Sequence, residues 1–497
     1  MASEIGFDSE LYLRLQSEHI RERISHFDKL YLEFGGKLFD DFHASRVLPG
    51  FAPDNKLKML EQLKDQAEIV LAVGADAIEQ NKVRGDLGIT YDVDAIRLVS
   101  VFRSRGFLVN SIVITKYNGQ PAADKFRQKL DSIGVRSYLT YMIEGYPSDV
   151  AKIVSDQGFG KNDFVETTRP LVVITAPGPG SGKMATCLSQ MYHEHKRGVN
   201  AGYAKFETFP IWNIPLRHPV NLAYESATAD LDDLNMIDPY HLEAYGETTV
   251  NYNRDIEIFP VLAALFEAIS GSCPYKSPTD MGVNMAGNAI VDDEICKRAA
   301  CQEIIRRYYK TACSLKKGNA DKNELLKQKI LLQQAGVEPS DRKVAEEAVA
   351  LQEKTGNPAA AIEIDLEEKE VIVTGRTNAL LGAAASCMLN TLKVLAGIPH
   401  EEKVISEEAL LPIQTLKTRY LGGHNPRLHS DEMLIALSAS SSMNEHARLA
   451  MDQLPKLRGT EAHSSVILSH VDEETYRRLG IQLTCTPEYE EGKEFIV

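Results

Sequence analysis

The stretch that decides the fold is LVVITAPGPGSGK at residues 171–183. Leu171–Thr175 is an uninterrupted apolar run, which is typical of a buried strand. The run enters a turn rich in glycine and proline, which ends at Lys183, and Met184–Lys196 continues with helical periodicity. A strand, a glycine turn and a helix in this order predict one βα unit of a parallel sheet.

The same alternation fills the first 210 residues on the amino-terminal side of this unit. Short apolar runs predict strands at Leu30–Phe34, Ile69–Val73, Ser111–Thr115 and Ser137–Ile143. Amphipathic stretches predict helices at Lys56–Asp65, Asp94–Arg105, Ala122–Ile133 and Pro147–Asp156. We therefore expect an α/β protein with a doubly wound parallel sheet, whose glycine-containing loops face one edge.

Three segments are predicted along the chain. Residues 1–290 form the α/β domain with the P-loop-like turn, extended from about residue 211 by an irregular, proline-containing part. Residues 291–358 form a helical subdomain that bridges domains or builds a homo-oligomer contact, and residues 359–497 form a second, smaller α/β domain. Beyond residue 290 the expected elements are helices at Asp292–Lys317, Lys322–Ala335, Ser340–Lys354, Asn378–Ala396 and Asn444–Leu454, and strands at Val371–Thr374 and Ser465–Leu468.

The composition excludes several classes of protein. With 55 basic and 70 acidic residues the net charge is −15, which argues against a general nucleic-acid or membrane-surface binder, because both need a basic face. The first residues lack the basic start and apolar core of a signal peptide. Seven cysteines without a CxxC pair favour reduced thiols and a cytoplasmic protein.

The turn after Leu171–Thr175 predicts a phosphate site. Glycines let main-chain N–H groups turn toward an anion, the following helix adds its positive end, and Lys183 adds a charge. The expected ligand contacts are Gly178, Gly180, Ser181, Gly182, Lys183 and Thr186. The alternative is a turn that only lets the strand and helix pack closely.

The match to the P-loop pattern GxxxxGK[ST] is imperfect. Pro177 stands at the first glycine, and Met184 replaces the hydroxyl residue that normally holds Mg²⁺. Thr186 or Ser181 could supply that hydroxyl instead. The cofactor prediction is therefore a nucleotide, with or without Mg²⁺.

A second strand–glycine–lysine sequence, EFGGK, lies at residues 33–37. If both loops share one sheet edge, Lys37, Arg46 and Lys183 form a cationic pocket. Arg46 could grip a phosphate or carboxylate with two hydrogen bonds, and His43 could act as general acid or base. Lys37, His43 and Arg46 are thus the candidate catalytic residues, and solvated charges on a surface turn are the alternative.

Other polar groups support weaker hypotheses. His193-Glu194-His195 is not the HExxH pattern of zinc proteases, because its histidines lie on different helix faces. Polar segments that contain Lys205 and Glu207, or Arg254 and Asp255, could hold a sugar or nucleotide, or serve as caps and turns. Four carboxyl-terminal histidines at 424, 429, 463 and 470 could bind a metal, but no fixed ligand spacing is visible, and no metal site is predicted.

Long motifs resemble a bacterial protein family of unknown function. They are EFGGKLFDDFHASRVLPGF at residues 33–51, TAPGPGSGKMATCLSQ at 175–190, YKSPTDMGVNMAG at 275–287 and RGTEAHSSVIL at 458–468. The resemblance covers nearly the whole chain and implies a cytoplasmic, multidomain α/β protein with a Rossmann-like N-terminal part. Members are sometimes labelled ATP-dependent zinc proteases, a label that the residues here do not support.

Three functions follow from these observations. The first is an enzyme that binds a nucleotide or another phosphorylated small molecule through a degenerate P-loop. The second is a non-catalytic sensor or scaffold that binds a phosphorylated metabolite, which the residue Met184 favours over a motor-type ATPase. The third is a metalloenzyme that uses the carboxyl-terminal histidines.

Overall fold

The computed structural model describes residues 5–35, 38–39, 41–84, 87–366 and 369–490. The chain divides into two compact units, Ser3–Ala300 and Cys301–Val497. The division falls inside helix α13 (Asp293–Lys316). No helix in the described ranges is both long enough and apolar enough to cross a bilayer.

The N-terminal unit is built on a parallel sheet. Its strands among the described residues lie in the order β11-β8-β1-β7-β2-β5-β6, and every pairing is parallel. All residues of β2 and β7 are buried, as expected for strands covered on both faces. The strands are β1 (Lys29–Phe34), β2 (Ala67–Gly74), β5 (Leu108–Tyr117), β6 (Arg136–Tyr141), β7 (Leu171–Thr175), β8 (Ala201–Phe206) and β11 (Gly282–Val283).

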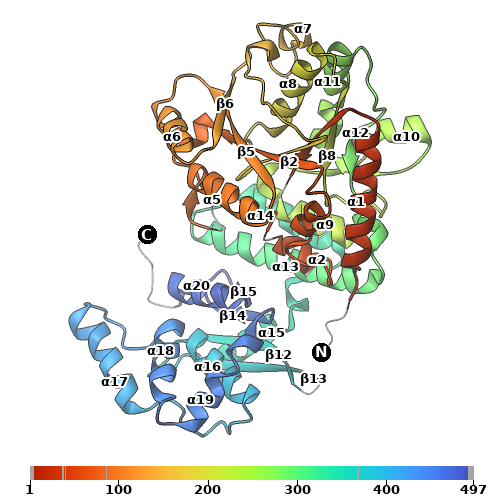
Figure 1. Cartoon of the computed structure of the whole chain (residues 1–497). Helices are drawn as coiled ribbons and strands as arrows, with labels where there is room; N and C mark the ends of the chain where they lie inside the picture. The colour runs from red at the N-terminus through yellow and green to blue at the C-terminus, as the bar shows by residue number, and fades with distance from the viewer. Residues whose placement is uncertain (1–4, 36–37, 40, 85–86, 367–368, 491–497) are drawn as a thin grey trace. The chain divides into compact units, whose positions relative to one another are not determined.

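Helices cover both faces of this sheet. Along β1, Leu30 and Leu32 belong to one apolar cluster and Tyr31 to another, because successive side chains point to opposite faces. The first cluster is covered by α1 (Ser9–Ser25), α3 (Asn55–Glu61), α5 (Tyr91–Ser104) and α6 (Pro121–Ser132). The second is covered by α7 (Val150–Ile153), α8 (Lys183–Lys196) and α11 (Asn253–Ser270), and Figure 1 shows α8 beside α11.

The order of connections creates a topological switch point. From β1 the chain moves toward one edge of the sheet through β2 and β5 to β6. The connecting helices lie on the first face, which is the face that carries Leu30 and Leu32. The chain returns through β7, β8 and β11 with helices on the second face, as right-handed crossovers require. The neighbouring strands β1 and β7 are thus followed by helices on opposite faces. Ligands of open α/β sheets bind in the crevice that such a reversal opens.

The segment between β8 and β11 forms an irregular extension. It contains α9 (Pro219–Ala227), the antiparallel pair β9 (Asn235–Ile237) and β10 (Val250–Tyr252), α10 (Pro239–Tyr245) and α12 (Pro278–Met281). Buried Asp238 caps α10 and also accepts hydrogen bonds from Thr279 N and Oγ1. One carboxylate therefore joins α10 to α12.

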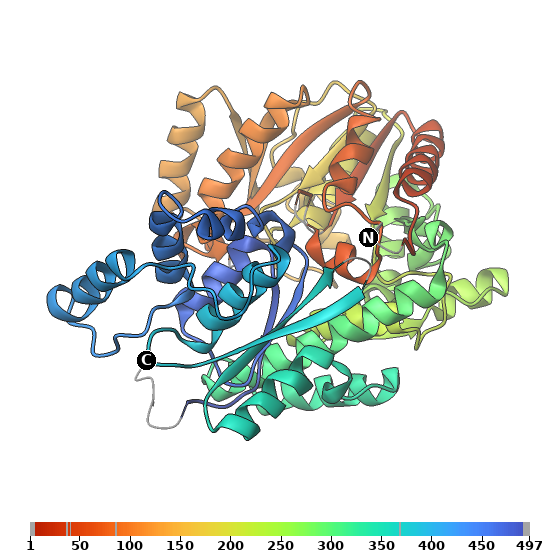
Figure 2. The same cartoon turned by 90° about the horizontal axis from the view of Figure 1, so that it is seen from below.

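The C-terminal unit is a separate mixed α/β structure. Its sheet has the order β13-β12-β14-β15, with β12 (Ala359–Leu366) antiparallel to β13 (Lys369–Arg376) and β14 (Glu461–Ser464), and β14 parallel to β15 (Gln482–Cys485). Figure 2 shows the long β12–β13 hairpin. The main helices are α14 (Lys322–Ala335), α15 (Lys343–Thr355), α16 (Ala383–Leu395), α17 (Glu407–Thr415), α18 (Ser430–Ser440), α19 (Glu445–Met451) and α20 (His470–Leu479).

The sequence-based fold class is confirmed: the chain is α/β, with a large parallel sheet and a smaller second sheet. The strand predicted at Ser465–Leu468 is wrong, because β14 ends at Ser464. The apolar run Val466–Leu468 follows the strand. The strand itself is formed by the less apolar sequence EAHS at residues 461–464. The three-segment division remains a prediction.

Candidate functional site

The candidate site lies at the carboxyl ends of β1 and β7, where the switch point falls. The strands that lead into the two glycine sequences, β1 and β7, are parallel hydrogen-bonded neighbours, so their carboxyl ends share one sheet edge. Lys37 and Gly36 lie outside the described residues. The loop of residues 176–182 and the start of α8 are described throughout.

Three carbonyl groups fix the orientation of the glycine loop. Lys116 Nζ donates to Gly180 O at 3.1 Å, and Thr115 Oγ1 donates to Ser181 O at 2.8 Å. Gly182 O accepts from Thr186 N at 3.0 Å and Thr186 Oγ1 at 2.9 Å. In a planar trans peptide the N–H points opposite to the carbonyl. The N–H groups of residues 181, 182 and 183 therefore point away from these partners.

The amino-terminal end of α8 is uncapped. Gly182 holds the N-cap position without a side-chain hydrogen bond. Within the described part of the chain, no acceptor bonds the N–H groups of residues 181–185, and the half-buried Lys183 has no ion-pair partner. Free N–H groups and the positive end of a helix dipole are favourable for an anion.

The glycines of the loop are needed for different reasons. A Cβ on Gly178 would lie 2.2 Å from the hydroxyl oxygen of Tyr91, so the loop could not keep its approach to α5. Gly180 and Gly182 have φ angles of 74° and 79°, in the left-handed region that favours glycine. A Cβ on Gly182 would also press on Thr115.

The two hydroxyls expected to replace the P-loop hydroxyl already have acceptors in the loop. Ser181 Oγ donates to Gly178 O at 2.8 Å, and Thr186 Oγ1 donates to Gly182 O. Both residues are buried. In this structure they hold the turn together. Their contact with a ligand remains a prediction.

A buried hydroxyl at the end of β7 has no hydrogen-bond partner. Thr175 is 1% exposed, and no described atom bonds its Oγ1. Buried polar groups are nearly always paired in native proteins. This unpaired group lies at the strand end that opens the glycine loop.

Lys116 supplies a backbone irregularity at the same edge. Its φ angle is 55°, a left-handed conformation that is costly for a residue with a Cβ. The register of β5 against β6 shifts between Ile114 and Tyr117. This conformation brings Lys116 Nζ to Gly180 O and within 3.2 Å of Asp76. Strained residues of this kind cluster at functional sites.

His43 and Arg46 lie on α2 (Phe42–Val47), which follows β1. The ring of His43 lies edge-on to Phe209 and Tyr224, with centroids 5.4 and 5.7 Å away. Arg46 is in the last turn of this helix. His43 therefore contacts the aromatic residues that follow β8. The catalytic roles of both residues remain predictions.

The structure joins two polar segments that the sequence analysis treated separately into one charged cluster at the end of β8. Lys205 Nζ contacts Asp255 and lies 2.7 Å from Glu207 Oε1. Tyr203 donates to Glu33 Oε2 at 2.8 Å, and Glu33 is a further carboxylate acting on Lys205. The sequence shows Lys205 and Glu207 close together. It does not show their partner Asp255, which lies 50 residues after Lys205.

The charges of this cluster shift the titration of its members. Burial raises the pKa of Glu207 to about 7, Lys205 opposes the rise, and Asp255 adds to it. Burial lowers the pKa of Lys205, but Asp255, Glu207 and Glu33 together raise it above its ordinary value. A carboxyl group that titrates near neutral pH is suited to proton transfer.

The cluster and the glycine loop share neighbours. Burial raises the pKa of the Cys187 thiol, Glu33 adds to the rise, and Lys183 opposes it. Glu33 therefore acts on Cys187 from the end of β1, and Lys183 acts on it from the start of α8. Glu33 on β1 lies in register with Ile174 on β7 and with Lys205 on β8, so the cluster and the glycine loop follow neighbouring strand ends of the sheet.

Several other polar groups singled out in the sequence have structural partners. Glu194 is buried and accepts from Lys29 Nζ at 2.6 Å and Tyr31 OH at 3.0 Å. His193 and His195 bond main-chain carbonyl groups. His463 lies between two threonines, whereas His429 pairs with Asp472. Over the described ranges no three His, Cys, Asp or Glu side chains converge as a metal site, so the metalloenzyme hypothesis has no ligand set there.

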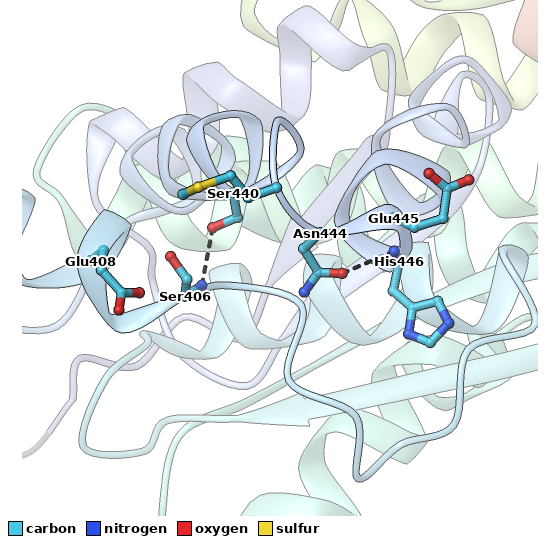
Figure 3. A pocket seen from close by; sticks show the side chains of 7 residues that line it. Ser406, Glu408, Ser440, Asn444, Glu445 and His446 are labelled. Carbon is cyan, nitrogen blue, oxygen red and sulfur yellow. Dashed lines mark hydrogen bonds between the residues drawn. The ribbon is translucent and has the colours of Figure 1, made fainter.

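A hollow of about 540 Å³ lies in the C-terminal unit (Figure 3). Ser406 N donates to Ser440 Oγ at 3.0 Å, and Asn444 Oδ1 caps α19 through His446 N at 2.9 Å. Its polar groups thus serve the ends of α17 and α19. It offers no cation comparable to Lys183, and we place the candidate site at the sheet edge.

These features define a class: doubly wound α/β proteins with a glycine loop and an uncapped helix at the switch point. Residues 5–336 match the N-terminal DUF1846 domain and residues 340–495 the C-terminal one, both described as domains of unknown function. The chain therefore belongs to the DUF1846 family. This confirms the resemblance to a bacterial family of unknown function.

Two relatives show how far the similarity extends. The UPF0371 protein of Streptococcus thermophilus strain CNRZ 1066 is 55% identical over 489 residues. The UPF0371 protein of Streptococcus pneumoniae strain JJA is 56% identical over 486 residues. In each case the alignment covers 98% of both chains, so the family likeness includes both units.

Proposed function

We propose that the protein is an enzyme that binds a nucleotide or another phosphorylated small molecule at the switch point between β1 and β7. The observation that carries the proposal is the uncapped start of α8, where no described residue accepts a hydrogen bond from the N–H groups beside Lys183. The bonded carbonyls of Gly180 and Ser181 turn the N–H groups of Ser181 and Gly182 away from Thr115 and Lys116. A phosphate would receive hydrogen bonds from the main chain and a charge from Lys183.

The loop chemistry favours binding that does not depend on magnesium. Met184 stands where a P-loop hydroxyl would hold the ion, and Thr186 bonds Gly182 O. For this reason a non-catalytic sensor of a phosphorylated metabolite is the second candidate. Thermal unfolding with ATP, with and without Mg²⁺, separates the two. Magnesium-dependent stabilisation together with turnover supports the enzyme, and metal-independent stabilisation without turnover supports the sensor.

The binding proposal is tested by Lys183→Ala. Calorimetry with ATP and with inorganic phosphate should show binding to the wild type and a loss of affinity of about 10-fold or more in the variant, because a charge-assisted contact contributes about 1.5–3 kcal/mol. Lys196→Ala, at the opposite end of α8, is the matched control and should bind as the wild type does. Unchanged affinity in Lys183→Ala would overturn the proposal.

A further inference from the structure

The charged cluster at the end of β8 has a geometry that the binding proposal does not use. The ammonium of Lys205 is shared between Glu207 and Asp255, which come from different elements, β8's carboxyl end and the first turn of α11. Three carboxylates, counting Glu33, act on this one ammonium. Full ionisation would leave uncompensated negative charge in a buried place, so a proton is readily held there.

The cluster is also reachable. The side chains of Lys205 and Asp255 are 24% and 22% exposed, whereas Glu207 is 6% exposed. Lys205 Nζ lies 5.7 Å from the ring centre of Tyr252, whose ring is 5.6 Å from that of Tyr224.

We propose that Glu207 and Asp255, held by Lys205, are the proton-transfer pair of the site, an inference that rests on the proposed function. Glu207 takes a proton from a hydroxyl group or a water molecule. The donor's O–H bond breaks, a new O–H bond forms on the Glu207 carboxylate, and the electron pair remains on the donating oxygen. The ammonium of Lys205 stabilises the charge that develops.

The substrate class follows from the two ends of the site. The loop and Lys183 suit a phosphate, and the carboxylates suit a hydroxyl group that donates hydrogen bonds. A phosphorylated compound with a free hydroxyl fits both. The charged and titratable groups that face the pair directly are Lys205 and Tyr203 on β8, Tyr224 on α9, Tyr252 on β10, and Asp233. Glu33 on β1 acts on Lys205, and Arg254 on α11 pairs with Asp233.

The first measurement is an infrared pH titration of the full-length protein. The wild type should show a carboxyl band that titrates near pH 7, and Glu207→Gln should lose it. Asp255→Asn should shift its midpoint downward, because Asp255 adds to the rise in the pKa of Glu207. Glu257→Gln, an exposed carboxyl on the same helix, is the control and should keep the band. An unchanged band in Glu207→Gln overturns the inference.

The second measurement separates this inference from the binding proposal. Calorimetry with inorganic phosphate in two buffers of different ionisation enthalpy counts the protons taken up on binding. A nearby anion raises carboxyl pKa values, so the wild type should take up a fraction of a proton near pH 7 and Glu207→Gln should bind without uptake. Equal proton uptake by the wild type and Glu207→Gln would contradict the proton-transfer pair and leave the binding proposal intact. No phosphate binding to the wild type would sink the binding proposal, and the infrared titration would then decide the pair.

Discussion

At the scale of single residues, Lys116 combines an unfavourable backbone with a contact to the glycine loop. Replacement by alanine or by glycine removes the same Nζ contacts, but only glycine relieves the left-handed φ angle. We expect Lys116→Gly to be more stable than Lys116→Ala by about 0.5–1 kcal/mol, measured by urea unfolding. At Lys125, inside α6, the order should reverse, because alanine favours a helix. Equal stabilities of the two Lys116 variants would show that the left-handed backbone at this position costs no free energy.

His463 makes the stability of the C-terminal unit depend on pH. Burial, with Arg342 nearby, lowers its pKa to about 3. Below its ordinary pKa of about 6.5 the unfolded histidine binds a proton that the folded one refuses, so stability falls as the pH falls. Between about pH 6.5 and 5 the wild type should lose about 2 kcal/mol more than His463→Gln. Urea unfolding at both pH values tests this, and parallel losses would refute it.

The residues of the site were predictable to different degrees. Gly178–Lys183 stood out because a strand, glycines and a lysine follow one another in the sequence. Lys205, Glu207 and Asp255 could not be joined from the sequence, because only folding brings α11 to the end of β8. The hydrogen bonds from Thr115 and Lys116 to the loop carbonyls could not be predicted either. Both residues belong to β5, which is two positions away from β7 in the sheet.

At the scale of elements, Asp238 acts as more than a helix cap. It is fully buried and bonds the start of α10 and two atoms of Thr279 on α12. Asp238→Ala leaves buried donors unpaired, and we expect a loss of about 3 kcal/mol in chemical denaturation. Asp321→Ala removes an exposed cap of α14 and should cost only about 1 kcal/mol. Similar losses for both would show that Asp238 is an ordinary cap.

Elements with a strong periodic signal were predicted well. Leu171–Thr175 is a strand with the expected bounds, and Lys322–Ala335 is a helix with the expected bounds. The strand β8 was not predicted, because AGYAKF begins with two small residues and lacks β-branched side chains. Its burial comes from its neighbours β1 and β11, which are distant in the sequence.

At the scale of the whole molecule, two buried arginines from the helical segment meet one carboxylate of the C-terminal sheet. Glu461 on β14 pairs with Arg306 on α13 at 2.6 Å and with Arg342 at 2.7 Å. A fragment of residues 340–497 keeps Arg342 but loses Arg306. We expect it to be less stable than residues 293–497 by about 3 kcal/mol or more in urea unfolding. Arg306→Ala in the longer fragment should reproduce part of this loss. Equal stability of the two fragments would contradict it.

The parallel sheet of the N-terminal unit also explains why the proposed binding site was easier to place than the proposed reaction. Alternation of strands and helices predicts the edge at which ligands bind, since this follows from topology. The proposed reaction depends on which side chains meet at that edge, and the candidate side chains come from β1, β8, α8 and α11. A homo-oligomer contact through the helices after residue 290 remains a prediction.

The most direct test is a crystal structure of the full-length protein with tungstate, a phosphate mimic whose metal atom is located by anomalous scattering. We predict an anomalous peak within hydrogen-bond distance of the N–H groups of Gly182 and Lys183 and of Lys183 Nζ, and its absence from Lys183→Ala crystals. A structure in which those N–H groups bond protein atoms, with tungstate bound only elsewhere, would contradict an anion site at the start of α8.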